Sequence, residues 1–328
     1  MATDYYVDAD SGSDANGGTS WGDAKEHLQA AIDLITGVVN DQTTIHLKAG
    51  TTAEYTQEVT IRGIRPLGAD AGLTIQPEIW TQSNYDDADG DPFNATPATG
   101  IFDITADDKP CVLTMDITVI DSVVDFLGME FEGKLTSQEM AHVLVAYSRF
   151  EGEDAMAFAN GYGGLTLENC YLDSMPLPVV AYANSTVSLM GDVYIVNPYI
   201  TGVWALVNSH VYIAPWGEKP TDYYTLQIKT TSPRQTDFAA IKAVGSSYVF
   251  VKSGDINPWD LSVSRVEITN DLDVLPPNYY GVVLESASVL QGASLMSFRT
   301  KNKKGDYVTM PAKQQFRGAA GEGVTLLK

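Results

Sequence analysis

The most acidic short segment of the sequence is Tyr85–Asn94, in which Asp87, Asp89 and Asp91 alternate with other residues. Alternating carboxylates on a turn can converge on one hard cation, because Ca²⁺ takes about six to eight oxygen ligands. The segment departs from an EF-hand loop, since Pro92 follows directly and no glutamate stands at the twelfth position. Two interpretations stay open: a calcium site at the three aspartates, or a solvated acidic loop.

Three charged residues close together, Arg149, Glu151 and Asp154, have the types needed to cleave a polysaccharide. Hydrolysis uses two carboxyl groups, one as the acid and one as the base or nucleophile, and elimination uses a base that removes a proton. On an exposed strand the same residues would only form its solvated side. Because no known catalytic motif contains them, no catalytic residue is assigned, and these three are the weak candidates.

Four aromatic residues, Tyr182, Trp204, Tyr212 and Trp216, fall in successive β-rich segments, and Tyr248 falls in a later one. Aromatic faces suit the apolar side of a sugar ring, so an exposed row of them would bind glycan. Tyr and Trp are also enriched at oligomer interfaces. A third interpretation is that these side chains fill the core.

The composition excludes several classes of protein. The 42 acidic and 20 basic residues give a net charge of -22, and nucleic acid binding needs a basic face. The N-terminus lacks the pattern of a secretion signal, and no apolar run is long enough to span a membrane. The spacing of Cys111 and Cys170 predicts two buried free thiols. No nucleotide-binding motif is present, so Ca²⁺ is the one cofactor under consideration.

Short β-rich segments recur along the chain at a drifting interval. This interval is 19 residues between Phe131 and Phe150 and 24 residues between Val187 and Val211. Such a period in a β-rich sequence predicts a solenoid whose equivalent strands stack into parallel sheets. The expected alignments are Phe131 with Phe150, Val143 with Leu165, Leu165 with Val187, Val187 with Val211, Val211 with Val249, and Val249 with Val289.

One helix is expected near the start of the chain, over Asp23–Ile35, where apolar residues follow a helical spacing. It comes after a strand and the Gly-, Asp- and Asn-rich segment Tyr5–Trp21. A calcium site at Asp8, Asp10 and Asp14 is the alternative use of that segment.

This order of elements resembles the entrance of right-handed parallel β-helix proteins of the pectate-lyase-like superfamily, a fold that phage tail spikes also use. The resemblance covers about 60 residues and implies an all-β chain, a right-handed parallel β-helix with a short N-terminal capping α-helix. The residues that carry it are Tyr6, Val7, Asp8, Gly12, Asp14, Gly17, Gly18, Trp21, Leu28, Ala31, Ile32, Leu47 and Gly50.

The charge changes sign near the C-terminus. Residues 299–328 hold seven bases and two acids, whereas the rest of the chain is strongly acidic. The predicted organisation is therefore a strand, loop and cap over residues 1–50, rungs with inserted loops over 51–298, and a basic tail over 299–328. The tail is expected to dock on acidic surface or to serve in assembly.

Together these features favour a structural or adhesion protein of a tailed-phage virion: a spike, tail appendage or capsid decoration. Its expected partners are other virion proteins, copies of itself as in trimeric spikes, and host surface polysaccharide. Nucleic acid and membrane insertion are not expected. Such a protein is made in the host cytoplasm and acts on the virion. The alternatives are a polysaccharide lyase or glycoside hydrolase, and a non-enzymatic carbohydrate-binding protein outside the cell.

Overall fold

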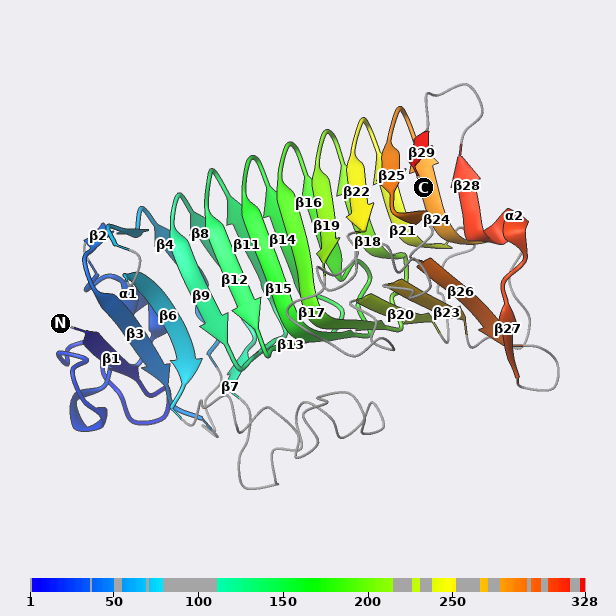
Figure 1. Ribbon diagram of the computed structural model, residues 1–328. Coiled ribbons are helices and arrows are strands. Elements are labelled where there is room, and N and C mark those ends of the chain that lie inside the picture. The colour runs from blue at the N-terminus through cyan, green and yellow to red at the C-terminus, as the bar shows by residue number, and fades with distance from the viewer. Residues whose placement is uncertain are drawn as a thin grey trace.

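The computed structural model shows a parallel β-helix (Figure 1). It describes residues 2–35, 37–49, 55–68, 71–78, 111–214, 226–230, 238–251, 266–270, 278–293, 296–301, 306–318 and 325–327. In Figure 1 the front strands run downward while the chain advances from the N-terminus on the left to the C-terminus on the right. The coil is therefore right-handed, as connections between parallel strands almost always are. No helix in the described ranges is both long and apolar enough to cross a membrane.

The strands form three faces, which the chain visits in turn. The first face comprises β1 (Thr3–Val7), β3 (Gln42–Leu47), β6 (Gly72–Pro77), β9 (Val123–Leu127), β12 (His142–Ala146), the first halves of β15 (Gly164–Asp173) and β17 (Thr186–Val196), β19 (His210–Ala214), β22 (Tyr248–Val251), β25 (Val289–Gln291) and β29 (Thr325–Leu327). The second face comprises β7 (Cys111–Leu113), β10 (Met129–Phe131), β13 (Arg149–Glu151), the second halves of β15 and β17, β20 (Leu226–Thr230), β23 (Val266–Asn270) and β26 (Met296–Lys301), with β27 (Tyr307–Thr309) antiparallel at its end.

The third face comprises β4 (Val59–Arg62), β8 (Ile117–Ile120), β11 (Lys134–Gln138), β14 (Met156–Asn160), β16 (Val179–Tyr182), β18 (Thr201–Leu206), β21 (Phe238–Val244), β24 (Tyr279–Glu285) and β28 (Phe316–Gly318). A separate pair, β2 (Val38–Val39) and β5 (Arg65–Pro66), lies near the N-terminal end.

The register confirms the predicted repeat, with one correction. Phe131 pairs with Phe150, and Leu165 pairs with Val187, as the intervals predicted. Val249 pairs with Leu290 and not with Val289. A slip of one residue exchanges the inner and outer sides of a strand. Leu290 is accordingly buried, and the predicted alignment at this rung was wrong by one residue.

The core fills the tube between the three faces, because alternate side chains of each strand point inward. Phe131 and Phe150 stack there with ring centroids 4.6 Å apart. Cys111 and Cys170 are buried free thiols within strands, which confirms the prediction for both.

Residues with a left-handed backbone conformation and buried serines form the corners of the tube. Gly128, Tyr147 and Asn169 turn the chain from the first to the second face with φ of +64°, +51° and +51°. The corner from the third to the first face carries a column of buried serines. The serines of that column are Ser122, Ser185, Ser209, Ser247 and Ser288. Their hydroxyls bond to backbone groups at the corner; that of Ser185, for example, donates to the carbonyl of Ala159 at 2.9 Å.

The N-terminal cap is present, but its helix is shorter than predicted. The helix α1 covers only Leu28–Ile32, after a 3₁₀ turn, η1 (Trp21–Asp23). Leu28, Ala31 and Ile32 are buried over the open end of the core. The helix cannot begin at residue 23, because Lys25 donates its backbone N–H to the carbonyl of Tyr6 and is held as an extended bridge.

The rungs continue beyond residue 298, where the change of charge had suggested a boundary. The strand β26 crosses that position, β28 pairs with β24, and β29 pairs with β25. The short helix α2 (Ala312–Gln315) joins β27 to β28. Basic side chains are compatible with a rung because the outer position of each strand faces water.

Candidate functional site

The predicted glycan-binding aromatics do not form one row. Tyr182 and Trp204 belong to β16 and β18 on the third face, whereas Tyr212 belongs to β19 on the first face. The ring of Trp204 lies under the ammonium group of Lys242, 5.6 Å from the centroid. Its buried indole N–H has no acceptor within the described part of the chain. Trp216 and the predicted calcium ligands Asp87, Asp89 and Asp91 lie outside the described residues.

Two of the three weak catalytic candidates contact each other on the second face. The guanidinium group of Arg149 forms an ion pair with Glu151 on the same strand, β13. The same group lies 5.7 Å from the ring centroid of Tyr171 on β15. Asp154 is exposed in the turn that follows β13.

Glu130 is the member of this cluster that sequence reasoning missed. It lies on β10 and pairs across the ladder with Arg149. Burial raises the pKa of the Glu130 carboxyl; Arg149 acts in the opposite direction, and the charges of Glu151 and Glu132 raise it further. The predicted alignment of Phe131 with Phe150 already placed Glu130 beside Arg149, so the signal was in the sequence.

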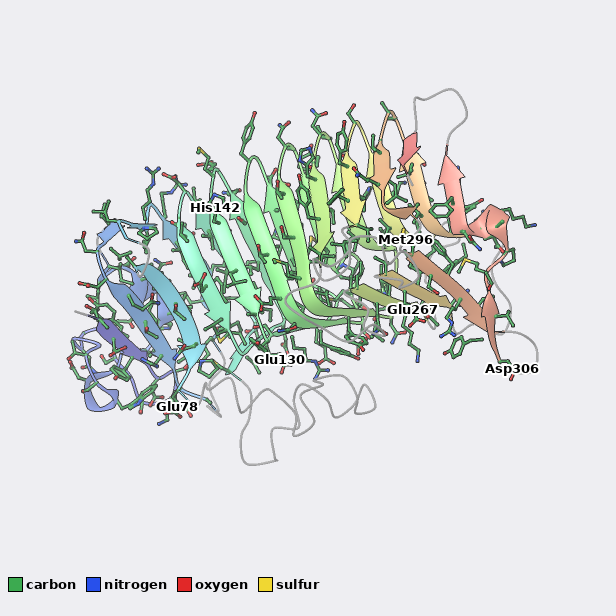
Figure 2. All side chains as sticks on the ribbon, in the orientation of Figure 1. Glu78, Glu130, His142, Glu267, Met296 and Asp306 are labelled. Atoms are coloured by element: carbon green, nitrogen blue, oxygen red, sulfur yellow. The ribbon has the colours of Figure 1, made fainter. Side chains whose placement is uncertain are left out.

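Two tyrosines extend this outer column of the second face. Burial raises the pKa of Tyr171 to about 12, and its ring centroid lies 6.5 Å from that of Tyr194 on β17. The Tyr194 hydroxyl accepts a hydrogen bond from the amide of Gln227 at 2.7 Å. A hollow of about 260 Å³ lies beside Tyr194 and reaches Arg299, which pairs with Glu267 at 3.2 Å. Figure 2 shows Glu130 and Glu267 along the lower side of the solenoid, where this face lies.

A second concave surface lies on the first face, and we call it the first-face trough. Its floor consists of Gly164, Thr166, Thr186 and Ser188 on β15 and β17, and its volume is about 320 Å³. Side chains of β9 and β12, namely Asp125, His142 and Leu144, border it toward the N-terminus. Burial raises the pKa of the Asp125 carboxyl. Figure 2 labels His142 on this front face.

Four rings beyond the other border of the trough form what we call the aromatic cluster: His210, Tyr212, Tyr248 and Phe250. His210 lies 5.3 Å from Tyr248 and 6.2 Å from Tyr212, and Tyr212 lies 5.9 Å from Phe250, all edge to face. Tyr212 and Tyr248 are 40% and 49% exposed. The cluster is thus a raised, partly exposed aromatic surface beside a low polar floor.

Strand register explains why trough and cluster adjoin. His142, Gly164, Thr186 and His210 pair in sequence across four neighbouring strands. Leu144, Thr166, Ser188 and Tyr212 form the parallel column two residues along. In both columns the two middle residues are small and the two outer ones are bulky, and this difference in size forms the first-face trough.

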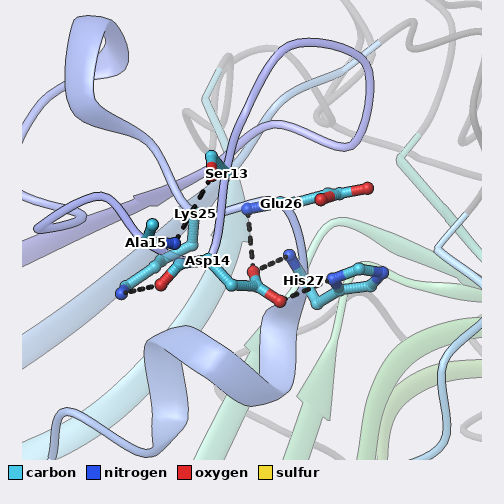
Figure 3. A network of polar contacts seen from close by, with 6 residues as sticks. All are labelled: Ser13, Asp14, Ala15, Lys25, Glu26 and His27. Atoms are coloured by element: carbon cyan, nitrogen blue, oxygen red, sulfur yellow. Dashed lines mark hydrogen bonds and ion pairs between the residues drawn. The ribbon is translucent and has the colours of Figure 1, made fainter.

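The acidic N-terminal segment has an architectural role. Asp8 is buried, and its carboxylate accepts bonds from the backbone N–H groups of Asp10 and Ser11 and from the Ser11 hydroxyl. Asp14 accepts bonds from the backbone of Glu26 and His27 and from the His27 ring (Figure 3). These bonds tie the loop to the cap. Within the described ranges, no cluster of His, Cys, Asp and Glu has the geometry of a metal site.

No protein-family model and no curated protein matches this chain. Solved structures similar to it include a GH136 lacto-N-biosidase from Eubacterium ramulus, with a TM-score of 0.32 and 11% identity over 99% of this chain and 68% of that one. Another is a mutant of a pectin methylesterase in complex with hexasaccharide IV, with a TM-score of 0.26 and 12% identity over 100% of this chain and 94% of that one. Both similarities are too low to assign the function of either protein to this chain.

Proposed function

We propose that this protein binds carbohydrate on the outside of its β-helix, at the first-face trough and the aromatic cluster. The observation that carries the proposal is the pair of exposed tyrosines, Tyr212 and Tyr248, packed edge to face with His210 and Phe250 next to a floor of hydroxyl side chains. Aromatic faces pack on the apolar side of a pyranose, and hydroxyls exchange hydrogen bonds with its rim. The trough volume lies at the lower end of the range of small-molecule sites.

The test is native electrophoresis of the full chain through gels that contain a polysaccharide, for a panel of polysaccharides. We expect retardation by at least one polymer and its loss in the double variant Tyr212→Ala/Tyr248→Ala. Tyr182→Ala is the matched control, because Tyr182 is 41% exposed but lies on the third face. Equal loss in the control would remove the aromatic cluster as the site, and no retardation of the unaltered protein by any polymer would refute the proposal.

A narrower role, as a structural or adhesion protein of a phage virion that contacts host polysaccharide, is also part of the proposal. It is supported by the continuous stack of parallel rungs, a rigid rod suited to a shaft or decoration. Light scattering of the full chain tests the expected self-association, with a trimer as the predicted state. The part that the basic C-terminal segment plays in self-association cannot be tested by ending the chain at Phe298. The rings of Phe298 and Phe316 pack together with centroids 4.9 Å apart, and the cut would remove β28 and β29. A monomer at all concentrations would contradict self-assembly.

The second candidate function is glycoside hydrolysis on the second face. It is favoured by two carboxyl groups in different environments: Glu130, whose pKa is raised by burial, and Glu151, which pairs with Arg149. Such a difference suits one acid and one base. Diagonal neighbours in a sheet lie about 7–8 Å apart, a separation that two carboxyl groups acting on one bond can span. Release of reducing ends from the same panel tests it, and activity that survives Glu130→Gln would exclude this assignment.

A further inference from the structure

We infer that the ligand of the first-face trough is an uncharged sugar chain, held at one or two of its rings. This inference rests on the proposed function, since it names the class of carbohydrate for the same site. It draws on three features of the trough: its charge, its hydrogen-bonding groups and its size.

The charged groups around the trough disfavour an anionic ligand. Asp125 is the only carboxylate among the residues that line it, and none of those described lining residues is a lysine or arginine. Burial already disfavours the ionised form of Asp125, so a second carboxylate beside it would be placed in a poorly solvated site with no lysine or arginine among the described lining residues. The net charge of -22 also repels an acidic polymer before contact.

The polar groups of the floor suit a neutral polyol. Thr166, Thr186 and Ser188 each provide a hydroxyl that can donate and accept, and the Asp125 carboxylate can accept from two sugar hydroxyls. Leu144 and Tyr212, at the two ends of one column, provide the apolar contacts that the faces of a sugar ring need.

The size of the site limits how much of a polymer it holds. Two strands, β15 and β17, form the floor, and the bordering strands β12 and β19 lie three strand spacings apart, about 14 Å. Side chains of both borders occupy part of that width. Together with the volume of about 320 Å³, this leaves room for one or two pyranose rings.

The experiment compares three classes of polymer with the full chain in native affinity gels. The neutral class is dextran, galactomannan and mixed-linkage β-glucan, the acidic class is polygalacturonate and alginate, and the cationic probe is glycol chitosan. We expect retardation in the neutral class alone. For oligosaccharides of the retained polymer, calorimetry is expected to give a Kd that changes less than about twofold between 50 and 500 mM NaCl, because no ligand charge is screened.

Two matched variants locate the site. Thr186→Trp fills the floor and is expected to weaken binding at least about tenfold, the equivalent of about 1.4 kcal/mol. Thr118→Trp places the same bulk on an outer position of β8, on the third face, and is expected to leave the Kd unchanged. Circular dichroism of both variants checks that the β-helix is intact.

The possible results separately test the absence of charge on the ligand, the location of the site and carbohydrate binding itself. Retardation only by acidic or by cationic polymers, lost in Thr186→Trp, would overturn the uncharged ligand and leave carbohydrate binding standing. Neutral binding that Thr186→Trp and Thr118→Trp affect equally would overturn the trough as the site. Retardation of the unaltered protein by no polymer of any class would overturn both this inference and the proposed function.

Discussion

Replacing Gly163 by serine is expected to destabilise the protein, although serine is the common residue at this corner of the tube. Gly163 occupies in its rung the position that Ser185 occupies in the next one. A Cβ atom at Gly163 would overlap the backbone carbonyl of Ser137 and lie 2.9 Å from the backbone nitrogen of Gln138. Because backbone atoms cannot rotate away, the expected cost is that of an overpacked core, about 1–3 kcal/mol.

The structure also explains why this rung has no corner serine. Ser137 supplies a hydroxyl from the neighbouring strand, which donates to the carbonyl of Gly164 at 2.8 Å. One rung later Ala159 stands where Ser137 stands, and Ser185 supplies the hydroxyl from the corner. The atoms that a Cβ at Gly163 would meet belong to the backbone, so Ser137→Ala leaves the overlap in place in the double variant Ser137→Ala/Gly163→Ser.

Urea unfolding followed by circular dichroism measures the free energies. Ser137→Ala alone removes a buried hydroxyl and should cost about 0.5–1.5 kcal/mol. The double variant should be no more stable than Gly163→Ser alone, because Ser137→Ala removes no atom that a Cβ at Gly163 would meet. Gly22→Ser is the control, expected within about 0.5 kcal/mol of the original, because a Cβ there meets no atom within 4 Å. A neutral Gly163→Ser, or a double variant that is more stable than Gly163→Ser alone, would refute the reasoning.

Three further predictions concern groups whose environments the structure defines. Burial raises the pKa of Glu130 in the folded state, so the folded state holds the proton of this carboxyl more tightly than the unfolded state does. The free energy of unfolding should therefore fall as the pH rises past 4.5. In unfolding experiments from pH 4 to 7, Glu130→Gln should make that fall shallower. Burial raises the pKa of Cys111, and that of Cys170 to about 12, so neither thiol should react with Ellman's reagent at pH 8 until urea exposes both. Asp8→Ala should lower stability by about 1–3 kcal/mol through loss of its bonds to Asp10 and Ser11, and added calcium should not restore it; recovery with calcium would contradict the architectural role of this loop.

The strand residues that face the core could be predicted from the sequence. Core-facing residues are mostly apolar, so Phe131 and Phe150 could be aligned without coordinates. The prediction failed at the alignment of Val249 with Val289, because Val289 and Leu290 are both apolar and either could have faced inward. Ser288 resolves the ambiguity, since it is the buried corner serine that corresponds to Ser247.

The cap helix was overpredicted for a different reason. The apolar spacing of Leu28, Ala31 and Ile32 is helical, and these residues are indeed in α1. The residues before them are held outside the helix by backbone bonds between Lys25 and β1. The backbone N–H groups of Glu26 and His27 also donate hydrogen bonds to the Asp14 carboxylate. Such long-range bonds leave no periodic trace in the sequence.

By itself, the sequence determined that the chain coils into a β-solenoid, which side chains alternate into the core, and that an N-terminal segment caps the open end. Only the tertiary structure decided which outer residues become neighbours. Trp204 and Tyr212 are close in sequence but lie on different faces, whereas Asp125 and Thr186 are remote in sequence but line the same trough. The physical reason is that core packing constrains the inner position of every strand, while an outer position is free to vary and gains its neighbours from the register of adjoining rungs.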